Sequence, residues 1–169
     1  DNEDLNPITA DVIQNHVEEL KSKGEATPHA EILHQLIEQF EPLDFEVLAF
    51  PQAEKLREQL KKAAPGSEQA KDIQKQLDKL KLNRKHYLVL SIENALQFAE
   101  KNRWGLCKNH DFIYLYNGTF WAEIDKETFQ KFLGEAAEQM GVAKFSARFY
   151  QFREQLFKQF LASAYLPTP

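Results

Sequence analysis

FIYLYNGTFWAE, residues Phe112–Glu123, is the stretch from which the fold of this 169-residue chain can be worked out. Two short aromatic runs flank Asn117-Gly118, and this dipeptide is the strongest local signal for a two-residue hairpin turn because both residues accept a positive φ with little strain. Counting outward from that turn gives four pairs: Tyr116 with Thr119, Leu115 with Phe120, Tyr114 with Trp121, and Ile113 with Ala122. Directly opposed residues share a face of a ribbon. We therefore expect the aliphatic residues and Phe120 on a buried face, and the Tyr, Trp and Thr side chains on an outer face.

The segment after the hairpin is predicted to be a helix that covers it, because a lone hairpin is only marginally stable in water. Asp125 can cap this helix, and Gly141 is placed to end it. Its apolar residues keep helical spacing. They are Phe129, Phe132, Leu133, Ala136, Ala137 and Met140.

Further elements are predicted on both sides of this unit. Trp104–Cys107 has the composition of a third strand, with Lys108–Asp111 as its connection to the hairpin. Before it, Tyr87–Leu90 leads into a helix that Ser91 is expected to cap. A last helix from about Ala143 to Ala164 has apolar residues on two faces, which indicates deep burial or a protein partner. Its two stripes are Phe145, Phe149, Phe152, Leu156 and Phe160, and Tyr150, Phe157, Leu161 and Tyr165.

The N-terminal half is predicted to be helical. Asn6-Pro7 or Thr9 can start a first helix that ends at Gly24, with Ile13, Val17 and Leu20 on one face. Thr27-Pro28 can start a second helix, with Thr27 as its cap, that ends before Pro42. Leu43–Phe50 is too short for its periodicity to decide its state.

Residues 52–64 and 67–86 form two charged segments with narrow apolar seams, separated by Ala64-Pro65-Gly66-Ser67. This pattern predicts an antiparallel helical hairpin that projects from the body. The alternative is a partly disordered, lysine-rich linker.

The expected fold is therefore mainly α, in the α+β class, with a helical bundle around a small antiparallel hairpin or three-stranded meander. We divide the chain into a helical N-terminal region, residues 1–84, which includes the charged hairpin at about 52–86, and an α+β domain, residues 85–169, which carries the hairpin 112–123.

Charge is distributed unevenly along the chain. Residues 1–50 hold two lysines against twelve acidic residues, whereas residues 51–90 hold ten Lys/Arg against five. Such asymmetry can orient a protein against a charged partner, although solvated helix faces are the simpler interpretation.

Other features of the sequence concern the compartment in which the protein is found and whether the chain is a piece of a longer protein. No apolar run is long enough to span a bilayer, and the first residues, DNEDLNP, do not resemble a signal peptide. A single cysteine, Cys107, excludes an internal disulfide and fits a reducing compartment, so we expect a cytoplasmic protein with no membrane partner. Met140 is the only methionine, so we expect the chain to be a piece of a longer protein.

No motif for catalysis or metal binding is present. The chain has no phosphate-binding loop, no Gly-x-Ser-x-Gly nucleophile elbow and no His-Glu-x-x-His helix. His29 and His34 would lie about 140° apart around a helix, so they cannot bind one metal ion together. Cys107 and His110 have the spacing of half a zinc site, but no second pair is near. We expect no catalytic residue, no metal and no cofactor.

Nucleic-acid binding is a further hypothesis. Tyr114, Tyr116 and Trp121 could stack on bases, at about 1–3 kcal/mol per base. The alternative, which we favour for any single residue, is that these aromatics pack under the helices and that the cations edge the last helix. The cations that could contact phosphates are Lys108, Lys144, Arg148, Arg153 and Lys158.

Trp104–Val142 resembles the domain that precedes the superfamily 3 helicase in phage and plasmid DNA primase–helicases and in the poxvirus replicative one. An aromatic hairpin followed by a Phe-Leu-rich helix carries the resemblance, which extends over about residues 85–165 and leaves residues 1–84 outside the pattern. The matching residues are Tyr114, Tyr116, Gly118 and Trp121, then Phe132 and Leu133.

The resemblance implies a parent protein with a primase upstream and a hexameric, ATP-driven helicase downstream. It implies that this piece is a non-catalytic accessory domain that links the two activities and assists ring assembly or DNA engagement. Its partners would be the primase and helicase domains of the same polypeptide, further copies of itself, and single-stranded DNA. The alternative is a stand-alone single-stranded DNA-binding or protein-interaction module, and a small nuclease is a third class. No catalytic residue carries over from the family.

Overall fold

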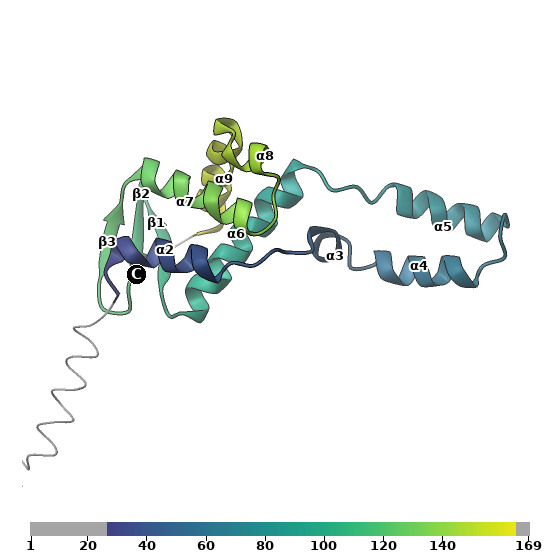
Figure 1. Cartoon of the computed structure of the whole chain (residues 1–169), viewed down its shortest axis with the longest axis horizontal. Coiled ribbons are helices and arrows are strands. Elements are labelled where there is room, and N and C mark those ends of the chain that lie inside the picture. Colours follow the sequence, from purple (N-terminus) through teal and green to yellow (C-terminus); the bar gives the residue numbers. More distant parts are fainter. Residues whose placement is uncertain (1–26, 165–169) are drawn as a thin grey trace, which may run out of the picture.

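The computed structural model describes residues 27–164, and its architecture is mainly helical with one small sheet, which confirms the expected α+β fold (Figure 1). The first predicted helix, between Asn6 and Gly24, and Tyr165 of the last one lie outside the described residues. In chain order the elements are α2 (His29–Gln39), α3 (Phe45–Ala49), α4 (Ala53–Lys62), α5 (Glu68–Asp78), α6 (Arg84–Lys101), β1 (Gly105–Asn109), β2 (Phe112–Tyr116), β3 (Trp121–Ile124), α7 (Lys126–Gln139), α8 (Lys144–Arg148) and α9 (Tyr150–Ser163).

The sheet is an antiparallel meander with the order β1-β2-β3. The predicted third strand is confirmed, because β1 pairs with β2 from Gly105 opposite Tyr116 to Asn109 opposite Phe112. Its bounds differ from the prediction, since Lys108 and Asn109 belong to the strand and not to the connection. The two strands are joined at a tight turn in which His110 has a φ of 56°.

The predicted register of the second hairpin is wrong by two residues. Tyr116 stands opposite Trp121, not Thr119, so Thr119 and Phe120 lie in the loop and Phe120 is 57% exposed instead of buried. Of the Asn-Gly pair only Gly118 has a positive φ, 94°. Because side chains alternate with a period of two, a shift of two residues leaves every strand residue on its predicted face.

A long-range contact of Asn117 explains the shifted turn. This residue is only 6% exposed, and its Oδ1 accepts hydrogen bonds from the backbone N–H groups of Thr119 (2.9 Å) and Phe120 (3.0 Å). Its Nδ2 donates to the carbonyl of Thr27, 3.2 Å away. Asn117 therefore caps the loop and ties it to the start of α2, instead of taking the positive φ that a type I′ turn needs.

The helix after the hairpin, α7, is confirmed. The Asp125 side chain accepts a hydrogen bond from the backbone N–H of Thr128 and caps the helix, and Gly141 follows its end with a φ of 108°. All six predicted apolar residues are buried. The ring of Phe129 contacts those of Phe132, Phe157 and Phe160, which places it at the centre of the core.

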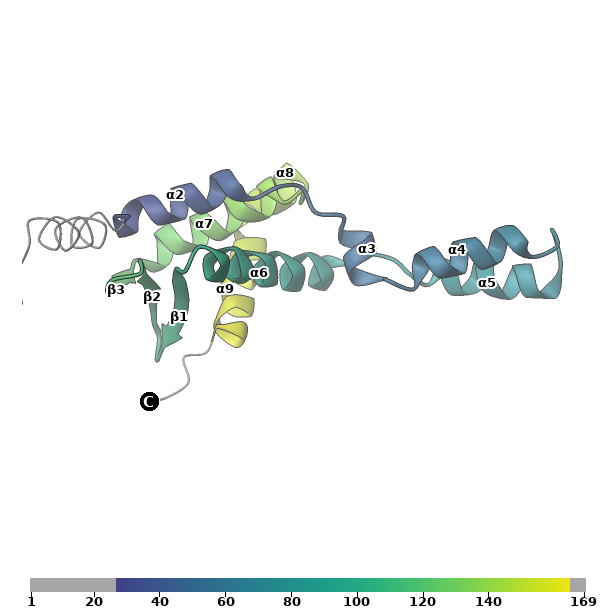
Figure 2. The same ribbon diagram turned by 90° about the horizontal axis from the view of Figure 1, so that it is seen from below.

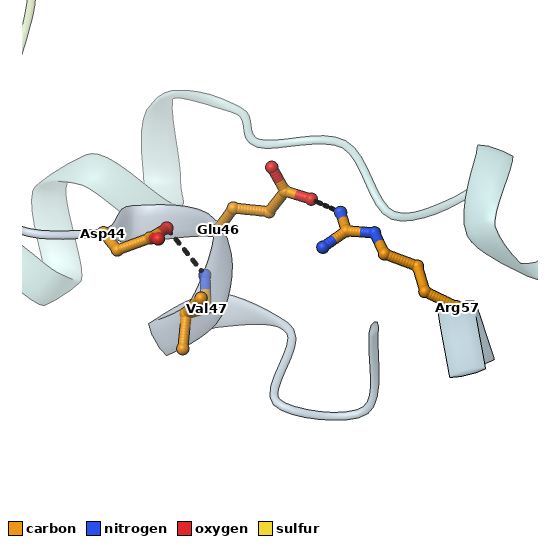
Figure 3. Close-up of polar contacts among 4 residues, drawn as sticks. All are labelled: Asp44, Glu46, Val47 and Arg57. Carbon is orange, nitrogen blue, oxygen red and sulfur yellow. Dashed lines mark hydrogen bonds and ion pairs between the residues drawn. The ribbon is translucent and has the colours of Figure 1, made fainter. Parts of the chain in front are cut away.

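The start of the described chain joins this core. α2 begins at His29 with Pro28 in the cap position, so Thr27 does not cap it as predicted, and it ends before Pro42. It packs on α7 and α6. The undecided segment 43–50 contains the short helix α3, which the side chain of Asp44 caps by accepting from the backbone N–H of Val47 (Figure 3).

Helices α4 and α5 form an antiparallel arm that projects from the body, as predicted (Figures 1 and 2). Gly66, with a φ of 76°, lies in the turn between them, and Ser67 caps α5. The second helix ends at Asp78 instead of continuing to 86. At the base of the arm Arg57 forms an ion pair with Glu46 of α3 (Figure 3).

Two helix boundaries differ from the prediction. Ser91 lies buried inside α6, whose cap is Asn83, because the helix continues through the segment 87–90 that was expected to precede it. The last helix is split into α8 and α9 at Phe149, which has an extended ψ of 133°. Ala147 and Phe152 would lie about 140° apart on one straight helix. The break allows both to be buried.

Candidate interaction surfaces

The outer face of the sheet carries four aromatic residues, which we call the aromatic face: Phe112, Tyr114, Tyr116 and Trp121. Phe112 is 51% exposed and Trp121 is 42% exposed, whereas the two tyrosines are half-buried. The predicted grouping of Tyr114, Tyr116 and Trp121 therefore describes one real surface. Phe112 was missed, although its position two residues before Tyr114 on the same strand indicates the same face.

The indole of Trp121 lies across the sheet from β3 to β1. A Cβ atom at Gly105 would stand only 2.7 Å from Cη2 of Trp121 and 3.2 Å from Cβ of Tyr116. The rings of Tyr116 and Trp121 are 5.1 Å apart between centroids, with 33° between their planes. Gly105 thus leaves the space in which the indole lies, and nothing local in the sequence predicts this contact.

The strands of the aromatic face supply no cation that could contact a phosphate. Among strand residues the face carries Glu123, opposite Tyr114, and no lysine or arginine. Lys108 pairs with Ile113, so its side chain belongs to the opposite face. Its backbone N–H donates to the carbonyl of Ala164 at 3.1 Å, which joins the edge of β1 to the end of α9.

The other four predicted cations lie on α8 and α9. Arg148 donates from two nitrogens to the carboxylate of Glu138, at 3.1 and 3.2 Å. The Nε of Arg153 is buried against α7 without a hydrogen-bond partner among the described residues. Lys144 and Lys158 are exposed.

Of these cations, Lys144 and Arg148 are not brought together with the aromatic face, because both lie on α8. α7 starts directly after β3 and is 14 residues long, so its far end, where α8 begins, lies about 21 Å from its start. Figure 2 shows α8 and the sheet at opposite ends of α7.

The bend between α8 and α9 exposes a second apolar patch, which we call the elbow: Phe145, Phe149 and Tyr150. Phe145 is 88% exposed and Tyr150 is 61% exposed. The rings of Phe149 and Tyr150 contact each other at 5.0 Å. The predicted stripe of the last helix is therefore buried only from Phe152 onward, and the sequence pattern alone did not distinguish its two parts.

In the described part of the chain, His29, His34 and Cys107 pack or pair with neighbouring residues and do not gather at one site. The ring of His29 packs on Phe120 and its Nε2 lies 3.0 Å from the Phe120 carbonyl oxygen, whereas His34 pairs with Glu38 at 3.4 Å. Cys107 is buried, and burial raises the pKa of its thiol from 9.0 to about 11. Residues 27–164 contain no group of three His, Cys, Asp or Glu side chains that could hold a metal ion.

None of the helices described between residues 27 and 164 combines the length and the apolar character that crossing a membrane requires. In comparisons with known proteins, no family model, no curated protein and no solved structure matches this chain.

Proposed function

We propose that this chain is a non-catalytic accessory domain of a phage/plasmid-type DNA primase–helicase, which links the primase to the helicase and assists assembly of the helicase ring. The resemblance of Trp104–Val142 to that family supports the proposal. The order of hairpin, capped helix, glycine and aromatic helix is also present in the fold, with α7 between Asp125 and Gly141.

The observation that carries a protein-binding role is the aromatic face. Protein interfaces are enriched in Tyr, Trp and Phe and depleted of charge at their centres. The face presents these side chains without a cation from its own strands, and the indole of Trp121 already lies over Gly105. A site for single-stranded DNA combines stacking aromatics with a cationic groove. DNA engagement is therefore the second role in our proposal.

The intact parent protein offers the direct test. We expect Tyr116→Ala with Trp121→Ala to reduce its assembly into a ring, measured by mass photometry, because both rings would be lost from the interface. Leu48→Ala is the matched control, since Leu48 is also exposed but lies on α3. Normal assembly of the double variant, or a loss of single-stranded DNA binding alone, would contradict the linking role.

The family assignment has a test of its own. The reading frame is expected to encode a phosphate-binding loop after Pro169, because the helicase of this family hydrolyses ATP. A complete reading frame without that loop would remove the assignment, whatever the aromatic face binds.

A further inference from the structure

A groove lies at the end of the body farthest from the sheet, between the start of α6 and the turn from α7 to α8. Apolar side chains and the cation Arg84 line it. The apolar ones are Leu82, Tyr87, Val142 and Phe152. Because Val142 follows the end of α7 and β3 precedes its start, the length of α7 separates the groove from the hairpin.

The chain segment that forms one side of this groove is rich in cations. Residues 79–92 contain Lys79, Lys81, Arg84 and Lys85 and no acidic residue, and Lys144 follows the groove residue Ala143. None of these cations is in an ion pair with another residue of 27–164. Two of them lie in the first turn of α6, where the helix dipole disfavours positive charge. An acidic partner would relieve this repulsion.

The chain itself contains a segment of matching chemistry. Residues 1–26 hold seven acidic residues against two lysines, and Ile13, Val17 and Leu20 recur at the spacing of one helix face. An acidic segment with an apolar stripe complements an apolar groove with a basic rim in both respects.

This segment joins the body at the end opposite the groove. Thr27 is held at the hairpin loop by the hydrogen bond from Asn117, and His29 is held there by Phe120. The loop between β2 and β3 and the start of α6, which lines the groove, lie at opposite ends of the body (Figure 1). A contact between opposite ends of two copies is head-to-tail, and such contacts build rings when the rotation closes.

We propose that the acidic segment 1–26 of one copy docks in the basic groove of the next copy. This inference deepens the proposed function and rests on it for its purpose, since a head-to-tail contact is what a ring requires. The exposed elbow residue Phe145, one position after Lys144, extends the apolar surface available to the same segment.

The test uses the full 169-residue chain in sedimentation velocity over a range of concentrations and at two salt concentrations. We expect association at low salt that weakens as salt screens the charges. Arg84→Glu with Lys85→Glu should weaken it by about a hundredfold, because like charges then face each other. The control is Lys61→Glu with Lys62→Glu, which makes the same charge change on the arm.

A charge swap separates docking from a structural effect. Adding Glu18→Lys and Glu19→Lys to the Arg84→Glu, Lys85→Glu chain should restore association, which damage to the fold would not permit. A chain that stays monomeric at low salt, or an unchanged association after the first double substitution, would overturn the inference. Loss of single-stranded DNA binding without loss of association would identify a nucleic acid as the occupant instead.

The failure of this inference can be told from the failure of the proposed function. If the Arg84→Glu, Lys85→Glu parent protein forms rings and the Tyr116→Ala, Trp121→Ala protein does not, only the docking of the segment is wrong. If both form rings normally, the proposed role in ring assembly is wrong as well.

Discussion

Gly134→Ala tests how closely α7 and α9 approach each other. Gly134 is buried in the middle of α7. A Cβ atom there would stand 3.0 Å from the carbonyl oxygen of Ala147 and 3.1 Å from Cγ of Arg153, and it would also collide with Nε of Arg153. The side chain of Arg153 thus occupies the space that the glycine leaves, and this explains why one of the predicted phosphate contacts has a buried Nε.

Two opposing effects determine how much Gly134→Ala changes the free energy of unfolding. Alanine is more favourable than glycine inside a helix by about 0.8–1.0 kcal/mol. Overpacking a close contact typically costs about 1–3 kcal/mol. We therefore expect Gly134→Ala to lower the free energy of unfolding by about 1 kcal/mol, the difference between the two effects, and the unfolding temperature by about 2–4 °C.

Four proteins are needed for the measurement: the wild type, Gly134→Ala, Arg153→Ala and the double variant. Urea unfolding followed by far-ultraviolet circular dichroism gives their free energies of unfolding. Arg153→Ala removes both Cγ and Nε, so only the Ala147 carbonyl still crowds the new methyl group. In that background Gly134→Ala should cost about 1 kcal/mol less than in the wild type, which is the size of coupling that contacting residues show.

The reasoning is refuted if Gly134→Ala stabilises the protein by about 1 kcal/mol in both backgrounds, as helix propensity alone predicts. Additivity within about 0.5 kcal/mol would mean that the two residues do not touch. Arg153 would then be an exposed cation, and its predicted role as a phosphate contact would regain support.

Four further results are expected. Asn117→Ala should lower the free energy of unfolding by about 1–3 kcal/mol in urea titrations, because it leaves two loop N–H groups without their acceptor, whereas the exposed Asn109→Ala should change little. Cys107 should react with iodoacetamide about a hundredfold more slowly in the native than in the unfolded chain, since burial raises its pKa from 9.0 to about 11. For the same reason its contribution to stability is complete below pH 9.0 and is lost as the pH rises towards about 11, so urea midpoints should fall over that range more for the wild type than for Cys107→Ala. Replacing Ala53–Asp78 with a short Gly-Ser linker should leave the main transition in calorimetry in place, because α4 and α5 pack chiefly on each other; loss of that transition would contradict an independent arm.

Elements with local signals were predictable from the sequence. Asp125, the spacing of the apolar residues and Gly141 define α7 without any tertiary contact, and the break at Ala64–Ser67 defines the arm. The hairpin register was not predictable in this way. It depends on Asn117 binding Thr27, which is 90 residues away, and this contact outweighs the local preference of Asn-Gly for a type I′ turn.

The candidate surface was predictable only in part. Alternation along β2 and β3 groups Tyr114, Tyr116 and Trp121 in either register, because the error was an even number of residues. No sequence pattern reports how far the cations of α8 stand from that face, since this distance is set by the length and direction of α7. The contact between Gly105 and Trp121 joins β1 to β3, and β2 lies between these two strands. This contact too follows only from the tertiary structure.

The two surfaces predict opposite responses of self-association to salt, and this distinguishes symmetric pairing from head-to-tail assembly. A basic groove cannot pair with its own copy, because Arg84 and Lys85 would face the same charges in the partner. An aromatic face can pair with itself, and burial of Trp121 and Tyr116 would persist as salt screens the charges. If association of the chain is lost at high salt, the groove and the acidic segment hold the copies together. If association survives high salt and is lost in Trp121→Ala, the aromatic faces hold the copies together, as the proposed function expects, and the docking of the acidic segment is wrong.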